Sequence, residues 1–385
     1  MKNYLKILVV GFLLMCLLVG CSNSEDTTEA NANEKSTETS QSSKAVEEDA
    51  NEITFTDTTG KEITLSLPVT KAVVINRNTA EAITLLGAQE AIIATGDNTI
   101  KNNGYLGLND FPDVGKTDEL NIESILELKP EVVFTFTNRP DNTLEEKLEP
   151  AGIKVVRLNN YLADQMDEEL RILAKIFGKE QRAEDYLTWK QSIEQMLEER
   201  TKDIPEEQKK TVLALSAGAL NTNGKYNIYP TSTLDGQAGP GEGYATILAG
   251  GTDPTPEILW DATKSSTTVN VEEEFVLTAN PDVITLHGNF FGGYDAQDET
   301  SFTEVLNNVI TNTAVSQMTA GKNKDVYMFY TNFFGSDKGY IGRLQLGKYL
   351  YPENFEDIVV EDYINEYFEN WLGVPASGVW FYGAK

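Results

Sequence analysis

The stretch NIESILELKPEVVFTF at residues 121–136 decides the fold of this chain, together with its counterpart EEEFVLTANPDVITLH at residues 272–287. Each begins with helical periodicity and an early glutamate, Glu123 in the first and Glu274 in the second. In each, a proline follows at the same distance from the glutamate and ends the helix, and an apolar run typical of a buried strand comes next. Because this pattern occurs twice, we predict two lobes that are built alike.

Short apolar runs alternate with helical periodicity on both sides of these stretches. A hairpin around Thr59-Gly60 opens the series, and strands that alternate with helices then imply a parallel sheet covered on both faces. The predicted strands are 72–75, 92–94, 132–136 and 153–158 in a first series, and 212–215, 283–286 and 326–329 in a second. The predicted helices of the first series are 79–86, 121–128, 144–151 and 162–177.

A long helical run from Glu180 to about Lys202 separates the two series, and Pro205 stops it. We therefore predict an α/β protein with two Rossmann-like lobes joined by one long helix, and a ligand cleft between the lobes. The predicted boundaries are an N-terminal lobe at 52–178, the connecting helix at 179–205 and a C-terminal lobe at 206–385.

Residues 1–20 have the three parts of an export signal, namely positive charge, an apolar core and small residues at the end. The small residues precede Cys21 in an arrangement that resembles the lipobox of bacterial lipoproteins, so we predict a lipid anchor at Cys21. The alternative is a plain signal peptide with a chance cysteine. Residues 21–51 have no aromatic side chain, and we predict a disordered tether there. The expected location is the cell membrane, on its extracytoplasmic face.

Composition excludes several classes of function. The chain has 60 acidic and 31 basic residues, and its formal net charge of −29 argues against binding to nucleic acid or to anionic lipid. Its two cysteines lie at positions 16 and 21, so we predict no disulfide and no thiolate metal site after processing. The one histidine, His287, argues against a bare zinc or manganese site, and a serine hydrolase would need a Gly-x-Ser-x-Gly motif. We therefore predict neither an enzyme nor a resident cofactor.

A set of motifs runs in order along the chain, at 56–65, 78–81, 111–115, 121–123, 128–133, 250–251, 280–284 and 349–353. Together they resemble the substrate-binding proteins of ABC importers for ferric siderophores, haem and cobalamin. The resemblance implies a protein that captures an iron chelate between two lobes with little hinge motion. It would deliver the chelate to an ABC permease and its ATPase, and would touch the membrane only through its lipid anchor.

The resemblance also implies that Glu123 and Glu274 are the paired carboxylates that dock on the two permease subunits. The alternative is that both are ordinary acidic helix starts, which the helix dipole favours.

Candidate ligand-binding residues follow from the rule that ligands bind beyond the carboxyl ends of the strands in open parallel sheets. Arg77 and Arg139 each follow a predicted strand, and a guanidinium forks onto carboxylate or catecholate oxygen; the alternative is a rim ion pair. Aromatic residues in the loops of the second lobe suit a flat, bulky ligand, or else pack between loops. The full set is Arg77, Asn78, Asp97, Asn138 and Arg139 in the first lobe, and Tyr226, Tyr229, His287, Phe290, Tyr330, Asn332 and Phe333 in the second.

Three local interpretations accompany this set. Asn78 with Glu81 fits a capping box, which is a structural role. The glycine-rich stretch 235–243 lacks the ending of a phosphate loop, and we predict a flexible loop at the cleft. A histidine in the position of His287 is more often a buried side chain than a ligand.

Two alternatives to the iron chelate stay open. Haem or a corrinoid would use the same fold, and haem would find Tyr105, Tyr226 or Tyr330 available as an axial ligand. A surface adhesin without a role in transport is the other alternative, which iron-dependent expression beside permease genes would separate from an importer.

Overall fold

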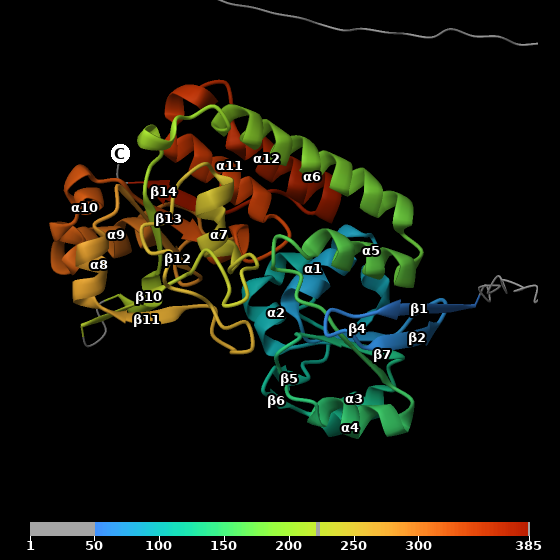
Figure 1. The fold of residues 1–385 in the computed structure, drawn as a ribbon. Helices are drawn as coiled ribbons and strands as arrows, with labels where there is room; N and C mark the ends of the chain where they lie inside the picture. The colour runs from blue at the N-terminus through green and yellow to red at the C-terminus, as the bar shows by residue number, and fades with distance from the viewer. Residues whose placement is uncertain (1–50, 221–223, 384–385) are drawn as a thin grey trace, which may run out of the picture. The chain divides into compact units, whose positions relative to one another are not determined.

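The computed structural model of the chain describes residues 51–220 and 224–383 (Figure 1). The predicted signal peptide at 1–20, the lipidation site Cys21 and the tether as far as residue 50 lie outside the described residues. Within the described part of the chain, no helix combines the length and the apolar character that crossing a membrane requires.

The N-terminal lobe is built on a 4-stranded parallel sheet in the order β4-β3-β7-β8. The central strands are buried on both faces, which explains why their sequences read as continuous apolar runs. The strands are β3 (Ala72–Val74), β4 (Ile92–Thr95), β7 (Val132–Thr135) and β8 (Lys154–Arg157), preceded by the antiparallel hairpin of β1 (Glu52–Thr56) and β2 (Glu62–Ser66). The helices are α1 (Arg77–Leu85), α2 (Asp97–Asn102), α3 (Ile122–Leu128), α4 (Thr143–Leu148) and α5 (Met166–Phe177), and β5 (Gly115–Lys116) pairs with β6 (Glu119–Leu120).

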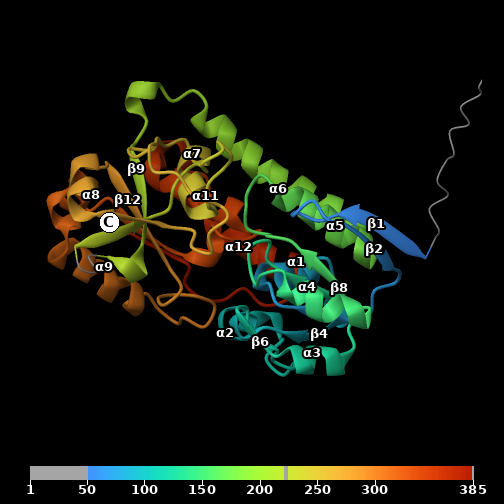
Figure 2. The same cartoon turned by 60° about the horizontal axis from the view of Figure 1, so that its bottom comes forward.

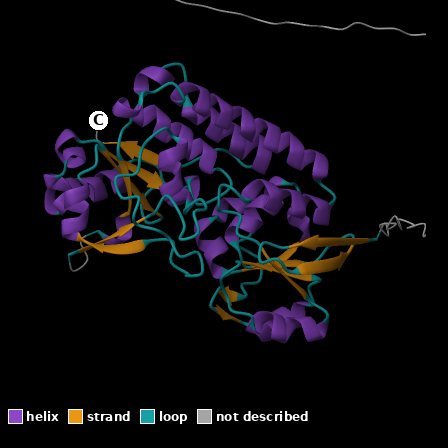
Figure 3. Cartoon of the chain, in the orientation of Figure 1, coloured by secondary structure: helices purple, strands orange, loops and turns teal. Residues whose placement is uncertain are grey.

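The C-terminal lobe is built on a 6-stranded mixed sheet in the order β11-β10-β9-β12-β13-β14. Figure 3 shows strands in orange and helices in purple, with helices packed around the sheets. In this mixed sheet, the central strands β9 (Val212–Ser216), β12 (Val283–Gly288) and β13 (Val326–Tyr330) are parallel, as predicted. The antiparallel outer strands β10 (Lys225–Ile228), β11 (Val269–Glu272) and β14 (Phe381–Gly383) were not predicted, because their short, partly exposed sequences lack a continuous apolar run. The helices are α7 (Gly241–Leu248), α8 (Glu273–Ala279), α9 (Thr300–Asn312), α10 (Thr319–Asn323), α11 (Gly339–Leu350) and α12 (Val360–Glu366).

The connecting helix α6 (Glu180–Thr201) runs along both lobes, packing on α5 of the first and α11 of the second (Figures 1 and 2). After α12, the π-helical turn Tyr367–Leu372 packs back on α1 of the N-terminal lobe. One hydrophobic cluster therefore contains Ile83 of α1, Leu187 of α6 and Phe368 of this turn. The two lobes share buried apolar surface in addition to the connecting helix, and the predicted α/β fold with two lobes and one long helix is confirmed.

The repeated stretches form the same structural unit in each lobe. Helices α3 and α8 both end in a residue with left-handed backbone, at φ 49° and 38°, followed by the proline and an acidic residue. In the first unit the Glu131 carboxylate accepts hydrogen bonds from the backbone N and the hydroxyl of Thr70, just before β3. In the second, the Asp282 carboxylate accepts the same pair from Thr211, just before β9. In both cases this carboxylate ties the helix to the strand that comes first along the chain in the main sheet of its lobe.

Candidate functional site

A pocket of about 200 Å³ lies between the lobes, at the carboxyl ends of the parallel strands. Its N-terminal wall comes from the segments that follow β3, β7 and β8. Its C-terminal wall comes from the start of α7, the segments that follow β10 and β13, and the segment that precedes β11. The lining residues are Arg77, Asn78, Phe136, Asn138, Arg139 and Tyr161 on one side, and Tyr229, Glu242, Ser265, Thr267, Thr331 and Gly335 on the other. A larger hollow of about 740 Å³ lies beside β14 and α11. It is lined by the C-terminal lobe alone, and no carboxyl end of a central parallel strand lines it. We therefore take the smaller pocket as the candidate site.

Hydrogen bonds between loops fix the N-terminal wall. The buried Asn76 side chain donates from Nδ2 to the carbonyl oxygens of Leu158 (2.7 Å) and Asn159 (3.1 Å), and its Oδ1 accepts from the Asn78 backbone N. Helix α1 is therefore capped by Asn76 and begins at Arg77. The predicted capping box between Asn78 and Glu81 is wrong, because the cap lies two residues earlier.

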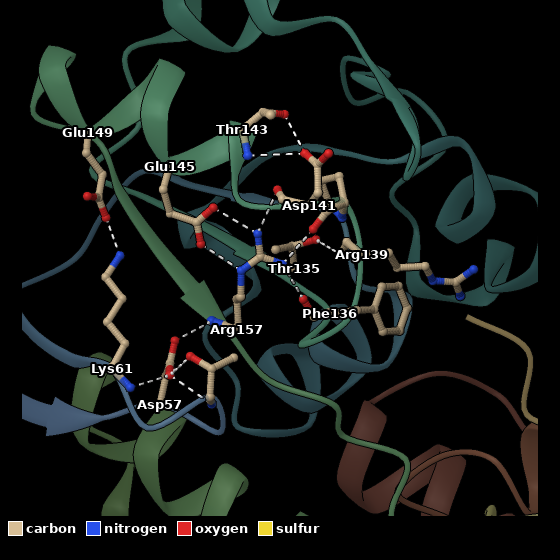
Figure 4. A network of polar contacts seen from close by, with 12 residues as sticks. Asp57, Lys61, Thr135, Phe136, Arg139, Asp141, Thr143, Glu145, Glu149 and Arg157 are labelled. Carbon is tan, nitrogen blue, oxygen red and sulfur yellow. Dashed lines mark hydrogen bonds and ion pairs between the residues drawn. The ribbon is translucent and has the colours of Figure 1, made fainter. Parts of the chain in front are cut away.

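Arg157 holds the loop that carries Asn138 and Arg139 (Figure 4). Its guanidinium, 3% exposed, donates to the carbonyl oxygens of Phe136 (2.9 Å), Pro140 (2.8 Å) and Asp141 (3.1 Å). It also forms a two-pronged ion pair with Glu145 of α4, at 2.6 and 2.8 Å. This buried fork fixes the backbone of the loop, so the pocket wall does not depend on the ligand for its shape.

Neither arginine of the pocket has a carboxylate partner among residues 51–220 and 224–383. Arg77 donates to Oδ1 of the buried Asn332, and the Arg139 guanidinium lies over the Phe136 ring, 4.7 Å from its centroid. Figure 4 shows the Arg139 side chain extending past that ring, away from the Arg157 network. The alternative interpretation, in which these arginines form rim ion pairs, is therefore not supported in the described part of the chain. Both guanidinium groups have N–H donors left for a ligand.

Glu242 is the one acidic residue in the lining, and it is 7% exposed. It lies in the first turn of α7, and the Thr331 hydroxyl donates to its Oε1 at 2.5 Å. Burial raises the pKa of Glu242, while the Thr331 hydrogen bond and the charge of Arg77 act in the opposite direction. The stretch 235–243, which was predicted to be a flexible loop, thus ends in the packed first turn of α7.

Two tyrosines complete the polar lining. Burial raises the pKa of Tyr161 to about 12, and burial also raises the pKa of Tyr229. Both hydroxyls therefore keep their protons at neutral pH and act as hydrogen-bond donors. The Tyr229 ring packs edge-on against His287, with 5.5 Å between the centroids.

Five of the predicted ligand-binding residues line this pocket, namely Arg77, Asn78, Asn138, Arg139 and Tyr229. Asn138 also donates from Nδ2 to the carbonyl oxygen of Lys264 at 2.9 Å, which links the two walls directly. A sixth, Asn332, adjoins the pocket through its hydrogen bond to Arg77. The binding roles of these residues stay predictions.

The structure does not bring the other predicted residues to the pocket. Asp97 pairs with Lys101 one turn along α2, at 2.8 Å. Phe290 is 54% exposed in the loop after β12, beside Phe291 and outside the pocket lining. Tyr226 is fully buried in β10, where its hydroxyl accepts from the Ala314 backbone N at 3.0 Å.

Three further candidates in the C-terminal lobe are core residues. His287 is 1% exposed, its Nε2 contacts the Thr285 hydroxyl at 2.8 Å, and burial lowers its pKa to about 3, so the ring is neutral. Tyr330 and Phe333 both pack against Trp380. The expectation that these aromatics cluster in exposed loops is wrong, because Tyr226 and Tyr330 lie in strands and the rings fill the core between sheet and helices.

Several lining residues were missed by the sequence analysis. Tyr161 and Thr331 follow strands β8 and β13, and the same strand-end rule would have included them. Glu242 follows no strand, and only the position of α7 in the fold reveals it. Ser265 and Thr267 lie in a long connection with no periodic signal.

A second polar cluster between the lobes, here called the interlobe clasp, is centred on Glu81 of α1 and Lys338 before α11. Both side chains are 0% exposed and their charged groups are 2.5 Å apart. The hydroxyls of Tyr367 (2.7 Å) and Tyr105 (2.8 Å) donate to the same Glu81 carboxylate. The Tyr367 hydroxyl oxygen also lies 2.8 Å from Oδ2 of Asp337 and shares its one proton between the two carboxyl groups. Burial together with the Glu81 charge raises the pKa of Asp337 to about 6.

The two predicted docking residues occupy matching places. Glu123 and Glu274 are both exposed in the first turns of α3 and α8, the helices of the repeated unit. The structure thus places Glu123 on the N-terminal lobe and Glu274 on the C-terminal lobe. Their docking role stays a prediction. In the described ranges, no group of three or more histidine, cysteine, aspartate and glutamate side chains is arranged to hold a metal ion.

Comparison with known proteins extends the likeness over most of the chain. The molybdate-binding protein MolA of Haemophilus influenzae is 23% identical over 347 residues, which is 82% of this chain and 89% of that protein. The iron-uptake system-binding protein of Bacillus subtilis is 29% identical over 126 residues, covering 32% of this chain and 38% of that protein.

Solved structures share the fold at low sequence identity. The TroA-like periplasmic binding protein FepB of Veillonella parvula has a TM-score of 0.69 at 21% identity, covering 86% of this chain and 100% of that chain. Molybdate-bound MolA, cognate to an ABC transporter of Haemophilus influenzae, has a TM-score of 0.67 at 19% identity, covering 85% of this chain and 100% of that chain. At these identities the two neighbours show a shared fold. The sequence pattern of the family described as periplasmic binding protein matches residues 73–330, and the chain belongs to that family.

Proposed function

We propose that this protein is an extracytoplasmic lipoprotein that captures a negatively charged ferric siderophore-type chelate and delivers it to the permease and ATPase of an ABC importer. The observation that carries the proposal is the pair of guanidinium groups, Arg77 and Arg139, which line the interlobe pocket and have no carboxylate partner among the described residues.

Charge makes this pair informative. The chain carries a formal net charge of −29, so arginines have many acidic residues with which to pair. Arg157, Arg171 and Arg200 all do so, at 2.6 to 2.8 Å. Two arginines that instead face a pocket supply the local positive potential that an anion needs inside a negative protein. Catecholate and carboxylate oxygens of a ferric chelate match that forked geometry.

The anchoring and delivery steps rest on the sequence. Cys21 and the tether at 21–51 would hold the folded body at the membrane, and Glu123 and Glu274 would meet basic residues of the permease. The similarity to the iron-uptake system-binding protein of Bacillus subtilis supports iron as the cargo.

A small metal oxyanion such as molybdate is the second candidate, and the pocket volume favours it. A pocket of about 200 Å³ lies below the ~300–1,000 Å³ typical of sites for drug-sized ligands, so only part of a chelate would be enclosed. Haem is less well supported, because Tyr105, Tyr226 and Tyr330, its candidate axial ligands, are buried and lie outside the pocket lining.

Titration calorimetry with a ferric tricatecholate that bears amide N–H groups, and with sodium molybdate, tests the proposal. We expect one-to-one binding of the chelate, and a loss of about 1.5–3 kcal/mol in Arg77→Gln or Arg139→Gln, or ten- to a hundredfold in affinity. Arg171→Gln, which removes an arginine of an exposed ion pair, is the matched control and should change little. Chelate affinity that is unaffected by both pocket substitutions would refute the proposed role, and tight binding of molybdate alone would favour the second candidate.

A further inference from the structure

Glu242 brings a carboxyl group into the same pocket as two guanidinium groups, and it pairs with neither of them. Arg77 donates to Asn332 and Arg139 lies over Phe136, while the Glu242 carboxyl accepts from Thr331. An acidic side chain that is 7% exposed would ordinarily be matched to the nearest cation. Here the three charged groups line one cavity and stay apart, so a ligand can lie between them.

The backbone around Glu242 fixes the position of this carboxyl group. A Cβ atom on Gly241 would lie 2.0 Å from the Phe334 carbonyl oxygen, and one on Gly243 would lie 2.2 Å from that of Pro230. Only glycine at both neighbouring positions lets the start of α7 approach these backbones so closely. The carboxyl group is therefore held against the pocket by packing as well as by its hydrogen bond from Thr331.

Glu242 is the acidic group of the lining, and burial raises its pKa above the usual range of a glutamate. The groups that face it from the surrounding elements are Arg77, Arg139, Tyr161 and Tyr229. Guanidinium groups stay charged, and both tyrosine hydroxyls have a raised pKa, so these four groups do not change charge near pH 7.

We propose that Glu242 is a specificity-determining residue, which admits anions that carry an N–H or O–H donor beside their anionic oxygens and disfavours anions that carry acceptors only. This inference rests on the proposed function in one respect, namely that the ligand is an anion held by Arg77 and Arg139. An ionised carboxylate only accepts hydrogen bonds, so a donor on the ligand satisfies it. An oxyanion such as molybdate offers no donor, and its charge would face that of Glu242 in a poorly hydrated site.

The test compares the same two probes, the ferric tricatecholate with amide N–H groups and sodium molybdate, in the wild-type protein and in Glu242→Gln. The substitution keeps the size of the side chain, removes its charge and supplies an amide donor. We expect molybdate to bind about ten- to a hundredfold more tightly to Glu242→Gln, while the chelate gains nothing or weakens. Glu257→Gln, which removes an exposed carboxylate of the same lobe outside the pocket, controls for net charge.

A pH series gives a readout that a purely structural role would not move. Because burial raises the pKa of Glu242, this carboxyl group gains its proton at a higher pH than an exposed glutamate does, which removes repulsion and creates an O–H donor. Molybdate affinity of the wild type should therefore rise as the pH falls, and that of Glu242→Gln should stay level. A matching rise in both proteins would overturn the proposal.

The outcomes separate this inference from the proposed function. A wild-type protein that binds molybdate but no ferric chelate would refute the proposed function, and the change in molybdate affinity on Glu242→Gln would still decide the role of Glu242. Molybdate affinity that is unchanged, lower or undetectable in Glu242→Gln would overturn that role whatever the chelate does. Thermal melts of both variants verify that each remains folded.

Discussion

The interlobe clasp and the interlobe pocket are both polar contacts between the same two lobes, and they treat charge in opposite ways. Glu81 of the clasp and Arg77 of the pocket lie one turn apart on α1. Glu81 is paired with Lys338 and fully covered, with tyrosine hydroxyls filling its remaining acceptor positions. Within the part of the chain that the structure describes, Arg77 donates to the amide oxygen of Asn332 and to no carboxylate, and it remains half-buried in the pocket lining.

The difference shows how one helix serves two purposes. A buried ion pair whose lone pairs are satisfied costs little while intact but resists separation strongly, because pulling the lobes apart would strand both charges. The clasp therefore fixes the distance across which the pocket groups face each other. The pocket can keep unpaired charges because the clasp, α6 and the shared hydrophobic cluster hold the lobes in place without them.

Removing one partner of the clasp should have the largest effect. In Lys338→Met the Glu81 carboxylate would remain buried without its cation, and we expect a loss of about 3–5 kcal/mol in the free energy of unfolding. Urea unfolding measures this loss. The double variant Lys338→Met with Glu81→Gln should recover part of the stability, because no unpaired charge remains. A loss below about 1 kcal/mol in the single variant would contradict the assignment of the clasp.

The pH dependence of stability sharpens the same contrast. Burial raises the pKa of Asp337 from 3.8 to about 6, so the folded state binds a proton more tightly than the unfolded state does. This residue therefore contributes stability below about pH 4, and the contribution is lost as the pH rises to about 6. In Asp337→Asn this part of the pH dependence should disappear. Unfolding curves of both proteins at several pH values test the prediction, and parallel profiles would contradict it.

The sequence analysis did not predict the clasp. Glu81 was assigned to a local capping box, because Asn78 and Glu81 have the right spacing along the chain. Its actual partner, Lys338, is 257 positions away and comes close only when the C-terminal segment returns to the first lobe. Hydrophobic periodicity located most helices of the first lobe, the connecting helix and the central strands because each pattern is local, whereas a pairing at this separation leaves no local pattern.

On the pocket side, loosening the support of the wall should weaken binding without removing a ligand contact. Arg157→Lys keeps the charge but loses the fork that holds Phe136, Pro140 and Asp141. Because the loop carrying Arg139 would then be less ordered, we expect chelate affinity to fall about tenfold, or ~1.4 kcal/mol. Calorimetry should show the loss mainly as a less favourable entropy. An unchanged affinity would mean that Arg139 does not depend on this support.

Part of the pocket lining could be predicted from the sequence, because parallel strands place their carboxyl ends at the same edge of a sheet. The strand-end rule found Arg77, Asn138 and Arg139, because those residues directly follow predicted parallel strands. It failed for Tyr226 and Tyr330, which lie within strands and bury their rings in the core. A loop tip and the end of a strand look alike in sequence when the strand is short and partly polar.

Charge reversal at the predicted docking residues should have the smallest effect on the isolated protein, and that absence of effect is informative. Glu123 and Glu274 are exposed, lie on opposite lobes and belong to neither the clasp nor the pocket lining. The double variant Glu123→Lys with Glu274→Lys should therefore keep its unfolding free energy within about 0.5 kcal/mol and its chelate affinity unchanged. Uptake in cells should be lost if both residues meet basic groups on a permease.

Reversal of Glu131 is not an equivalent control, because its carboxylate ties α3 to β3 through Thr70, so exposed Glu257→Lys serves instead. Normal uptake by the double variant would remove the docking role, and weakened chelate binding would show that these carboxylates act on the pocket from a distance.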